Sequence, residues 1–237
     1  MMAPMSASEP ELTVVIPVYN EESTILDVIA RVRRIEHSMQ IVVVDDCSTD
    51  GTAGQLATLP DDGVVEVVRH ARNQGKGAAL RTGFARARGG IVAIQDADLE
   101  YDPVDLPALM QPILDGAADV VYGSRLSGGK PQRVFMFWHL VGNRFLTLVT
   151  NVLFNTTLSD METGYKVMRR EVLAGITIRS DDFTVEPELT AKILKRRWRV
   201  YELPISYYGR TYDEGKKITW RHGITALAAL FRYRFTD

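Results

Sequence analysis

Short apolar segments alternate with helix-like segments along the first half of this chain. Residues 12–18 and 40–44 are runs of mostly Val and Ile without polar alternation, as in strands that are buried on both faces of a parallel sheet. Between them, residues 21–37 place apolar side chains at helical spacing, with acids at the front and arginines towards the back. This pattern predicts an α/β fold in which helices connect parallel strands.

The alternation continues through the middle of the chain. Further strands are predicted at residues 64–69, 90–95, 118–123 and 164–168, and further helices at residues 75–88 and 103–116. We therefore predict an open, doubly wound, mostly parallel sheet with helices on both faces. In such sheets ligands bind beyond the carboxyl ends of the strands, so the loops that follow the strands are the candidate site.

Length and composition favour one main domain. With 237 residues and 46% hydrophobic side chains, the chain can bury one sizeable core. We predict a flexible tail over residues 1–10, a main domain over residues 11–220 and an amphipathic helix over residues 221–237. The first residues lack the regions of a signal peptide and Cys47 is the one cysteine, which favours the cytoplasm over export. A net charge of −2 argues against a nucleic-acid partner.

Charge is unevenly distributed along the chain. Residues 92–119 contain seven acids and no Lys or Arg, whereas residues 192–234 contain eleven basic residues and three acids. The first segment could hold a divalent cation and the second could hold phosphates, or both could be solvated surfaces. The count alone leaves both interpretations open.

Polar residues follow three of the predicted strands, at residues 17–21, 45–51 and 96–100. No glycine-rich dinucleotide fingerprint follows the first strand and no P-loop motif occurs in the sequence, which argues against a dehydrogenase and a P-loop enzyme. Residues 73–77 (NQGKG) are the nearest approach to an anion-binding helix start. They are equally compatible with an ordinary helix entry that contains glycine.

The most apolar stretch covers residues 135–154. Its length approaches that of a membrane span, but Asn143 and Arg144 interrupt it and would be costly at the bilayer centre. We predict a helix that is either buried or lies on a membrane with Arg133 and Arg144 near the headgroups. The helix predicted at residues 224–235 offers the same alternatives, with three apolar residues on one face: Leu227, Leu230 and Phe231.

Seven short motifs occur in order along most of the chain. They are VVIPVYNE (14–21), DDCSTDGT (45–52), RNQGKGAALRTG (72–83), DADLEYDP (96–103), VYGSR (121–125), DMETGYKV (160–167) and ISYYGRTYDEGKK (205–217). Any one of them is weak, but the ordered set is specific. Together they resemble the family 2 glycosyltransferases of the GT-A fold, and within them the polyprenyl-phosphate (dolichyl-phosphate type) hexose synthases. The main domain would then be a GT-A catalytic domain.

The resemblance implies a UDP- or GDP-hexose as donor and Mg²⁺ or Mn²⁺ as cofactor. Asp96 and Asp98 match the metal-binding D-x-D motif, with Asp98 as the closer ligand, and Glu100 is a third candidate. A cation there would neutralise the charge that develops on the departing diphosphate. The alternative, that these acids only begin the next helix, suits Asp102 but not the pair, which would repel without a cation.

Five further residues are donor-site candidates. In the family, the residues matching Pro17, Tyr19 and Glu21 line the pocket for the base and ribose, and the residue matching Asp46 reads one of them. Tyr19 can stack and Asp46 can accept a hydrogen bond. Ordinary capping and turn roles are the alternative. Lys76, at a predicted helix start, is the fifth candidate.

The acceptor side is expected around Asp160, which matches the acid that inverting members place near the acceptor. Asp160 would act as general base towards a hydroxyl, but an acceptor phosphate is already anionic, and Asp160 would then orient the attack or bind the sugar. The basic candidates for phosphate binding are Arg125, Arg133, Arg210, Lys216 and Lys217. Arg125, Asp98 and Asp160 are the residues we expect to be catalytic.

The resemblance thus implies inverting, metal-dependent transfer of a hexose from a nucleotide diphosphate sugar to a polyprenyl (dolichyl or undecaprenyl) phosphate at the cytoplasmic face of the membrane. Because the chain ends at Asp237 without a predicted span, we expect either peripheral contact with lipid, through residues 135–154 and the C-terminal helix, or a soluble acceptor. A homodimer is compatible with both. The run RTYDEGKK departs from the pattern of the mannose synthases, so the sugar and its base stay open. The alternatives are transfer to a hydroxyl, a nucleotidyltransferase and a nucleotide-sugar-binding module without turnover.

Overall fold

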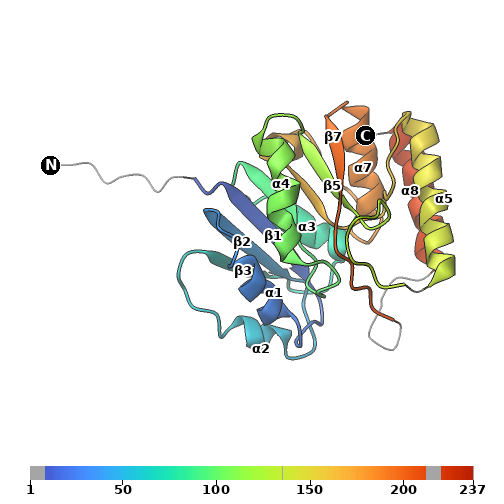
Figure 1. Ribbon diagram of the computed structural model, residues 1–237. Coiled ribbons are helices and arrows are strands. Elements are labelled where there is room, and N and C mark those ends of the chain that lie inside the picture. The colour runs from blue at the N-terminus through green and yellow to red at the C-terminus, as the bar shows by residue number, and fades with distance from the viewer. Residues whose placement is uncertain (1–8, 135, 212–219, 237) are drawn as a thin grey trace.

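The computed structural model describes residues 9–134, 136–211 and 220–236, and within them shows a seven-stranded sheet covered by helices (Figure 1). The strands are β1 (Leu12–Val18), β2 (Met39–Asp45), β3 (Val65–Arg69), β4 (Ile91–Ile94), β5 (Val120–Ser124), β6 (Lys166–Arg169) and β7 (Val200–Pro204). Their order across the sheet is β3-β2-β1-β4-β6-β5-β7. Only β6 runs antiparallel to its neighbours, so the predicted mostly parallel α/β sheet is confirmed.

Helices cover both faces of the sheet. They are α1 (Ile25–Val32), α2 (Thr52–Leu56), α3 (Lys76–Phe84), the 3₁₀ turn η1 (Pro103–Asp105), α4 (Leu106–Leu114), α5 (Phe137–Phe154), α6 (Arg170–Ala174), α7 (Val185–Lys195) and α8 (Trp220–Phe235). Helices α1 and α4 share one hydrophobic cluster with the sheet, and α3, α6 and α7 share another on the opposite face. Helices α5 and α8 lie side by side next to α7 (Figure 1).

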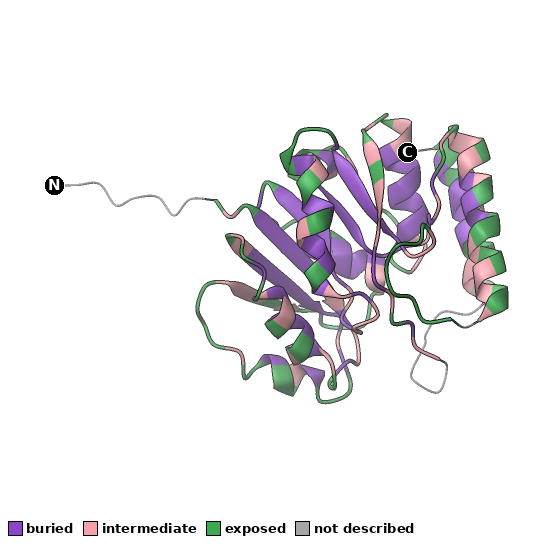
Figure 2. Ribbon diagram, viewed as in Figure 1, coloured by how far each residue is buried: buried purple, intermediate pink, exposed green. Residues whose placement is uncertain are grey.

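The central strands are buried on both faces, which explains why their sequences lack alternation. In β1, Val14 and Ile16 pack with the layer of α1 and α4, whereas Val15 packs with the layer of α3 and α7. Figure 2 shows β1 and β5 buried along their lengths while the outer sides of the helices are exposed. Burial on both faces selects Val and Ile at successive positions.

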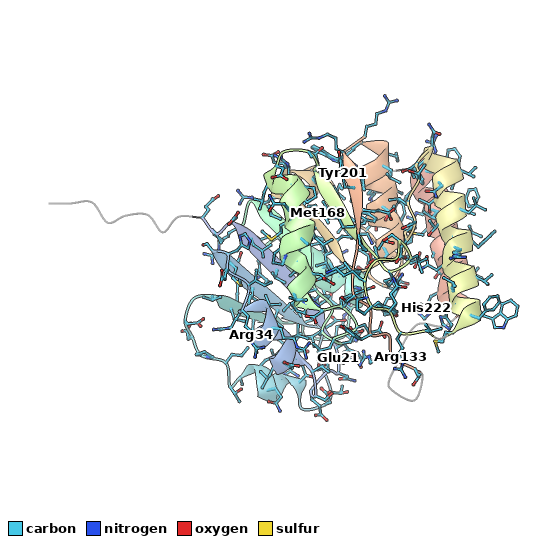
Figure 3. All side chains as sticks on the ribbon, viewed as in Figure 1. Glu21, Arg34, Arg133, Met168, Tyr201 and His222 are labelled. Atoms are coloured by element: carbon cyan, nitrogen blue, oxygen red, sulfur yellow. The ribbon has the colours of Figure 1, made fainter. Side chains whose placement is uncertain are left out.

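The reversed strand β6 brings an additional loop to the site. Because the other strands all point the same way, their carboxyl ends meet at one edge of the sheet, and the amino end of β6 lies at that same edge. The loop 159–165, which precedes β6, therefore joins the loops that follow β1, β2, β4 and β5. In Figure 3, Glu21, Arg133 and His222 lie towards this edge, and Met168 and Tyr201 lie towards the other end of the sheet.

Some predicted boundaries were wrong. Helix α1 is shorter than the predicted span 21–37, because polar groups of its first residues bind other segments: the Glu21 amide donates to Thr52 Oγ1, and Thr24 Oγ1 donates to the Ala97 carbonyl. Helices α2, α6 and α7 and strand β7 were not predicted.

The two predicted apolar helices pack against each other. Leu146 of α5 forms a cluster with Met161 and with Ala226 and Leu230 of α8. Of the apolar residues predicted on one face of α8, Leu230 is buried, whereas Phe231 is 47% exposed. Within the described chain, we find no helix that combines the length and the apolar character needed to cross a membrane.

Candidate active site

A cavity of about 390 Å³ lies among the loops at the carboxyl-end edge of the sheet. Ten of the predicted site residues line it: Pro17, Tyr19, Glu21, Asp46, Lys76, Asp96, Asp98, Glu100, Arg125 and Arg210. Asp160 is fully buried next to Arg125, and Lys216 and Lys217 fall outside the described residues. The lining residues that were not predicted as site residues include Glu162, Phe183, Glu186, Tyr207 and His222.

Asp96 follows β4 and is paired with a partly buried lysine. Lys76 Nζ, at the start of α3, lies 2.7 Å from Asp96 Oδ1 and 3.1 Å from Glu186 Oε1. Burial alone would lower the pKa of Lys76, but Asp96 and Glu186 outweigh it and the pKa is raised. Asp96 therefore has a protein cation beside it, and the prediction that the D-x-D pair would be uncompensated without a metal was wrong in this respect.

Asp98 belongs to a group of acids around Arg210. The Arg210 guanidinium donates to both oxygens of Glu21 at 3.0 Å and lies 3.1 Å from Asp98 Oδ2. Glu100 accepts hydrogen bonds from the Arg210 amide at 2.7 Å and from the Tyr207 hydroxyl at 3.0 Å. Burial, followed by the charges of Asp96 and Glu100, raises the pKa of Asp98 to about 7. Arg210 thus offsets the repulsion only in part.

These carboxylates fit a divalent cation that is also bound by the substrate. Mg²⁺ and Mn²⁺ prefer oxygen ligands, and a cation near Asp98 would counter the burial and the repulsion that together raise its pKa. Among the described residues, no group of three or more acidic, His or Cys side chains is arranged to hold a metal. With Glu100 turned to Tyr207 and Arg210, the candidate ligands are Asp96 and Asp98, and a donor diphosphate would supply others.

Asp46, at the end of β2, is held by protein donors. Its Oδ1 lies 2.6 Å from His70 Nδ1 and accepts the Gln74 amide at 2.9 Å, and its Oδ2 accepts the Gly75 amide at 2.7 Å. Asp46 therefore fixes the loop that leads into α3. If Asp46 also binds the base, as expected, its oxygens must accept that hydrogen bond in addition to those from the loop.

The start of α3 is closed by protein rather than open to an anion. Gly75, at φ +96°, precedes the helix, and a Cβ there would lie 2.3 Å from the Asp181 carbonyl oxygen. The Ala78 amide donates to that same carbonyl at 3.2 Å. The glycines at this helix start thus allow the backbone of residues 180–182 to pack closely against it. This favours the interpretation of residues 73–77 as an ordinary helix start over that of an anion-binding site.

Arg125 and Asp160 form a buried bidentate ion pair. Asp160 accepts Arg125 Nε and Nη2, each at 2.7 Å, and also the Arg125 amide at 3.0 Å and Asn143 Nδ2 of α5 at 2.9 Å. Burial alone would raise the pKa of Asp160, but Arg125 outweighs it and the pKa is lowered. A carboxylate so stabilised is a weak base, and its geometry suits positioning of the Arg125 guanidinium.

A second charged network lies under the cavity. Lys166, fully buried in β6, donates to Glu186 Oε2 of α7 at 2.5 Å. Burial alone would raise the pKa of Glu186, but Lys166 and Lys76 outweigh it and the pKa is lowered. Glu162 behaves differently: burial, followed by the charge of Glu186, raises its pKa to about 7.

Replacing Gly164 by alanine is expected to lower turnover roughly 10- to 100-fold with little change in Tm. A Cβ at Gly164 would lie 2.6 Å from Asp96 Oδ2 and 3.1 Å from Lys76 Nζ, so this ion pair must move while the surrounding backbone need not. Steady-state kinetics and thermal melting measure the two effects. Gly142→Ala is the control, because a Cβ there meets nothing within 4 Å; equal turnover in both variants would contradict the expectation.

Solved structures of similar fold place this architecture in a known class. Glucosyl-3-phosphoglycerate synthase of Mycobacterium tuberculosis, solved with Mn²⁺, UDP and phosphoglyceric acid, superposes with a TM-score of 0.74 over 96% of this chain and 80% of its own, at 21% identity. This likeness establishes the GT-A type of fold. A GT-A sheet with paired carboxylates in a cavity at its carboxyl-end edge defines the class of the nucleotide-sugar glycosyltransferases.

Sequence comparison specifies the family. The glycosyl transferase family 2 model matches residues 13–177, and the chain belongs to this family. It is 32% identical over 212 residues to the polyprenol monophosphomannose synthase of Mycolicibacterium smegmatis, covering 86% of this chain and 79% of the relative. It is also 33% identical over 220 residues to the low-salt glycan biosynthesis hexosyltransferase Agl6 of Haloferax volcanii, covering 90% of this chain. The chain spans 52% of the length of that second relative.

Proposed function

We propose that this protein transfers a hexose from a nucleotide diphosphate sugar to a polyprenyl phosphate, with inversion at the anomeric carbon and with Mg²⁺ or Mn²⁺ bound. The polyprenol monophosphomannose synthase relative supports the choice of acceptor. The nucleotide is expected near Pro17, Tyr19 and Asp46, and the diphosphate near Asp96 and Asp98. When bound there, the cation would supply positive charge to the departing diphosphate.

The observation that carries the choice of acceptor is the Arg125–Asp160 pair. Asp160, the acid expected near the acceptor, is fully buried and committed to Arg125, which itself lines the cavity. An acceptor hydroxyl needs a base, but a phosphate is already anionic and needs a cation to hold it. The pair is thus suited to a phosphate acceptor: Arg125 binds it and Asp160 positions Arg125.

In the proposed step, an oxygen of the acceptor phosphate forms a bond to the anomeric carbon. The bond from that carbon to the diphosphate oxygen breaks, and its electron pair leaves with the nucleoside diphosphate. No proton needs to be transferred, and Asp160 and Glu186, whose pKa values are lowered, can stay ionised throughout. The charges of Lys76 and Arg210 lie beside Asp96 and Asp98 and limit the repulsion of the incoming diphosphate.

Transfer to a hydroxyl is the second candidate function, and one observation favours it. Glu162 lines the cavity, and its pKa of about 7 is in the range that suits a general base. The Agl6 relative, a hexosyltransferase of glycan biosynthesis, is compatible with either acceptor.

The donor and acceptor are tested together. A panel of UDP- and GDP-hexoses with Mn²⁺ is screened by thermal shift, because a bound donor raises Tm by mass action. The best donor is then incubated with undecaprenyl phosphate and, separately, with a glycan acceptor, and the anomeric configuration of the product is read by NMR. A lipid-linked, inverted product supports the proposal, and a glycan product favours the second candidate. Pyrophosphate release or binding without transfer would contradict both.

We further propose that the protein contacts the cytoplasmic face of the membrane through the outer face of α5. Exposed apolar side chains recur there at helical spacing: Trp138, Val141, Phe145, Leu148 and Val152. Arg144, on the same helix, is exposed and could meet anionic headgroups. The inner face of α5 carries Asn143, which bonds Asp160, so this surface adjoins the proposed acceptor site.

Replacing Trp138 and Phe145 together by serine is expected to reduce binding to anionic liposomes at least about tenfold, because each side chain would otherwise bury apolar area in the bilayer interface. Co-sedimentation at low salt measures the bound fraction. Val104→Ser with Leu114→Ser is the matched control, since these apolar residues are exposed away from α5. If wild type and both variants bind liposomes equally, or not at all, the membrane surface is assigned wrongly.

A further inference from the structure

Glu162 is a cavity acid with a buried carboxylate oxygen that forms no hydrogen bond within the described part of the chain. It lies in loop 159–165, ahead of the reversed strand β6, and it lines the cavity. Its Oε1 is buried, and in the described part of the chain no group forms a hydrogen bond with it. A buried polar atom without a partner is costly in the free protein, so its presence in a cavity wall points to a ligand that completes it.

The neighbours of Glu162 in the loop place it between the two halves of the site. Two residues before it, Asp160 holds Arg125, the proposed binder of the acceptor phosphate. Two residues after it, Gly164 lies against Asp96, on the side of the donor diphosphate. In the proposed reaction, the acceptor phosphate attacks the anomeric carbon and the diphosphate leaves from it. The hexose ring must therefore lie between the acceptor phosphate and the diphosphate. Glu162 is therefore next to the expected position of the ring.

The other acids around the ring position are already engaged. Asp160 binds Arg125, Glu186 binds Lys166 and lies beside Lys76, and Asp46 binds the loop before α3. Glu186 Oε1 also lacks a hydrogen bond, but it lies 3.1 Å from Lys76 Nζ, whereas no ion pair is found for Glu162 among the described residues. The raised pKa of Glu162 is consistent with a carboxyl group that lacks a dedicated cation.

We propose that Glu162 binds a hydroxyl group of the transferred hexose and thereby contributes to the choice of donor sugar. This inference rests on the proposed function, because it needs a nucleotide-bound hexose in the cavity. A carboxylate that accepts a hydroxyl discriminates strongly against a sugar that lacks it, since the buried oxygen is then left without a partner. The nucleoside diphosphate part of the donor makes no use of Glu162.

The proposal predicts that Glu162→Gln weakens binding of the nucleotide hexose about 10- to 100-fold and leaves the affinity for the nucleoside diphosphate alone within about twofold. Calorimetry with Mn²⁺ measures both, using UDP-glucose against UDP and GDP-mannose against GDP. Glu162→Asp, which retains the charge but shortens the side chain, is the second variant. Glu171→Gln, at an exposed glutamate of α6, is the control and is expected to match wild type.

Deoxy donors identify the hydroxyl. Removing the hydroxyl that Glu162 binds should weaken the donor about 10- to 100-fold in wild type and about twofold or less in Glu162→Gln, whereas removing any other hydroxyl should affect both proteins equally. Equal losses in both proteins for every deoxy donor would overturn the proposal. So would a Glu162→Gln variant that binds all donors normally but has lost turnover, the signature of a general base. Failure of every nucleotide hexose to bind wild type more tightly than its nucleoside diphosphate would overturn the proposed function itself.

Discussion

Asp98→Ala is expected to lower the rate of hexose transfer about a thousandfold while the Tm of the metal-free protein stays the same or rises. The loss of rate follows from removal of a carboxylate expected to hold the cation at the departing diphosphate. The retained stability follows because Asp98 is a partly buried acid beside Asp96 and Glu100, whose charges oppose its ionisation. Steady-state transfer assays and thermal melting with and without Mn²⁺ measure both effects, and the variant should lose the rise in Tm that Mn²⁺ and donor give wild type.

Asp102→Ala is the matched control for this experiment. Asp102 lies in the same acidic segment, but its carboxylate accepts the Val104 amide at the start of η1. Loss of that cap is expected to cost about 1 kcal/mol of stability and little activity. A transfer rate in Asp98→Ala within tenfold of wild type would remove the support for a cation at this position.

Asp160→Ala is expected to destabilise the fold by roughly 3–5 kcal/mol, because it leaves the largely buried Arg125 guanidinium without its carboxylate. For a chain of this size, such a loss lowers Tm by about 10 °C. Transfer to undecaprenyl phosphate should fall at least about 100-fold, with a rise in the KM for the acceptor. Denaturant unfolding and acceptor titrations at saturating donor separate the two effects.

The double variant Arg125→Met with Asp160→Leu shows whether the ion pair serves stability or function. Replacing a buried ion pair by apolar side chains is often neutral for stability, so the double variant should be more stable than Asp160→Ala. Transfer should stay lost, because no guanidinium remains for the acceptor phosphate. Recovery of transfer together with stability would show that Arg125 does not bind the acceptor.

The sequence predicts those parts of the fold and site that local chemistry encodes. Strand β1 has the predicted bounds, residues 12–18, because burial on both faces requires an unbroken run of apolar residues. Asp96, Asp98 and Arg125 were identified from motifs at strand ends, and all line one cavity. The sequence did not predict which carboxylate pairs with which basic side chain, because the partners come from distant segments. Arg210, for example, donates to Glu21.

Helix α7 was not predicted, because its sequence lacks the alternation of polar and apolar faces that marks a surface helix. Its residues from Val185 to Ile193 are all buried, charged ones included, so no polar face alternates with an apolar one. Some of its charges are neutralised within the helix, as where Lys192 Nζ lies 2.5 Å from Glu188 Oε1, and Glu186 is paired with Lys166 of β6. Glu186, on this helix, was missed for the same reason, because a buried glutamate looks like a surface residue in a sequence. Glu162 was visible inside a motif, but nothing in the sequence marked its oxygen as unpartnered.

The reversal of β6 has a consequence for how such an enzyme can diversify. Under the proposed function, loops of the parallel half, after β1, β2 and β4, hold the nucleotide and its diphosphate, and the loops after β5 and before β6 handle the sugar and the recipient. The two sets belong to different stretches of the chain, 12–101 and 120–166. Substitutions in the later stretch can change the recipient without weakening binding of the nucleotide. One scaffold can therefore acquire a new sugar or a new recipient while it keeps the same nucleotide.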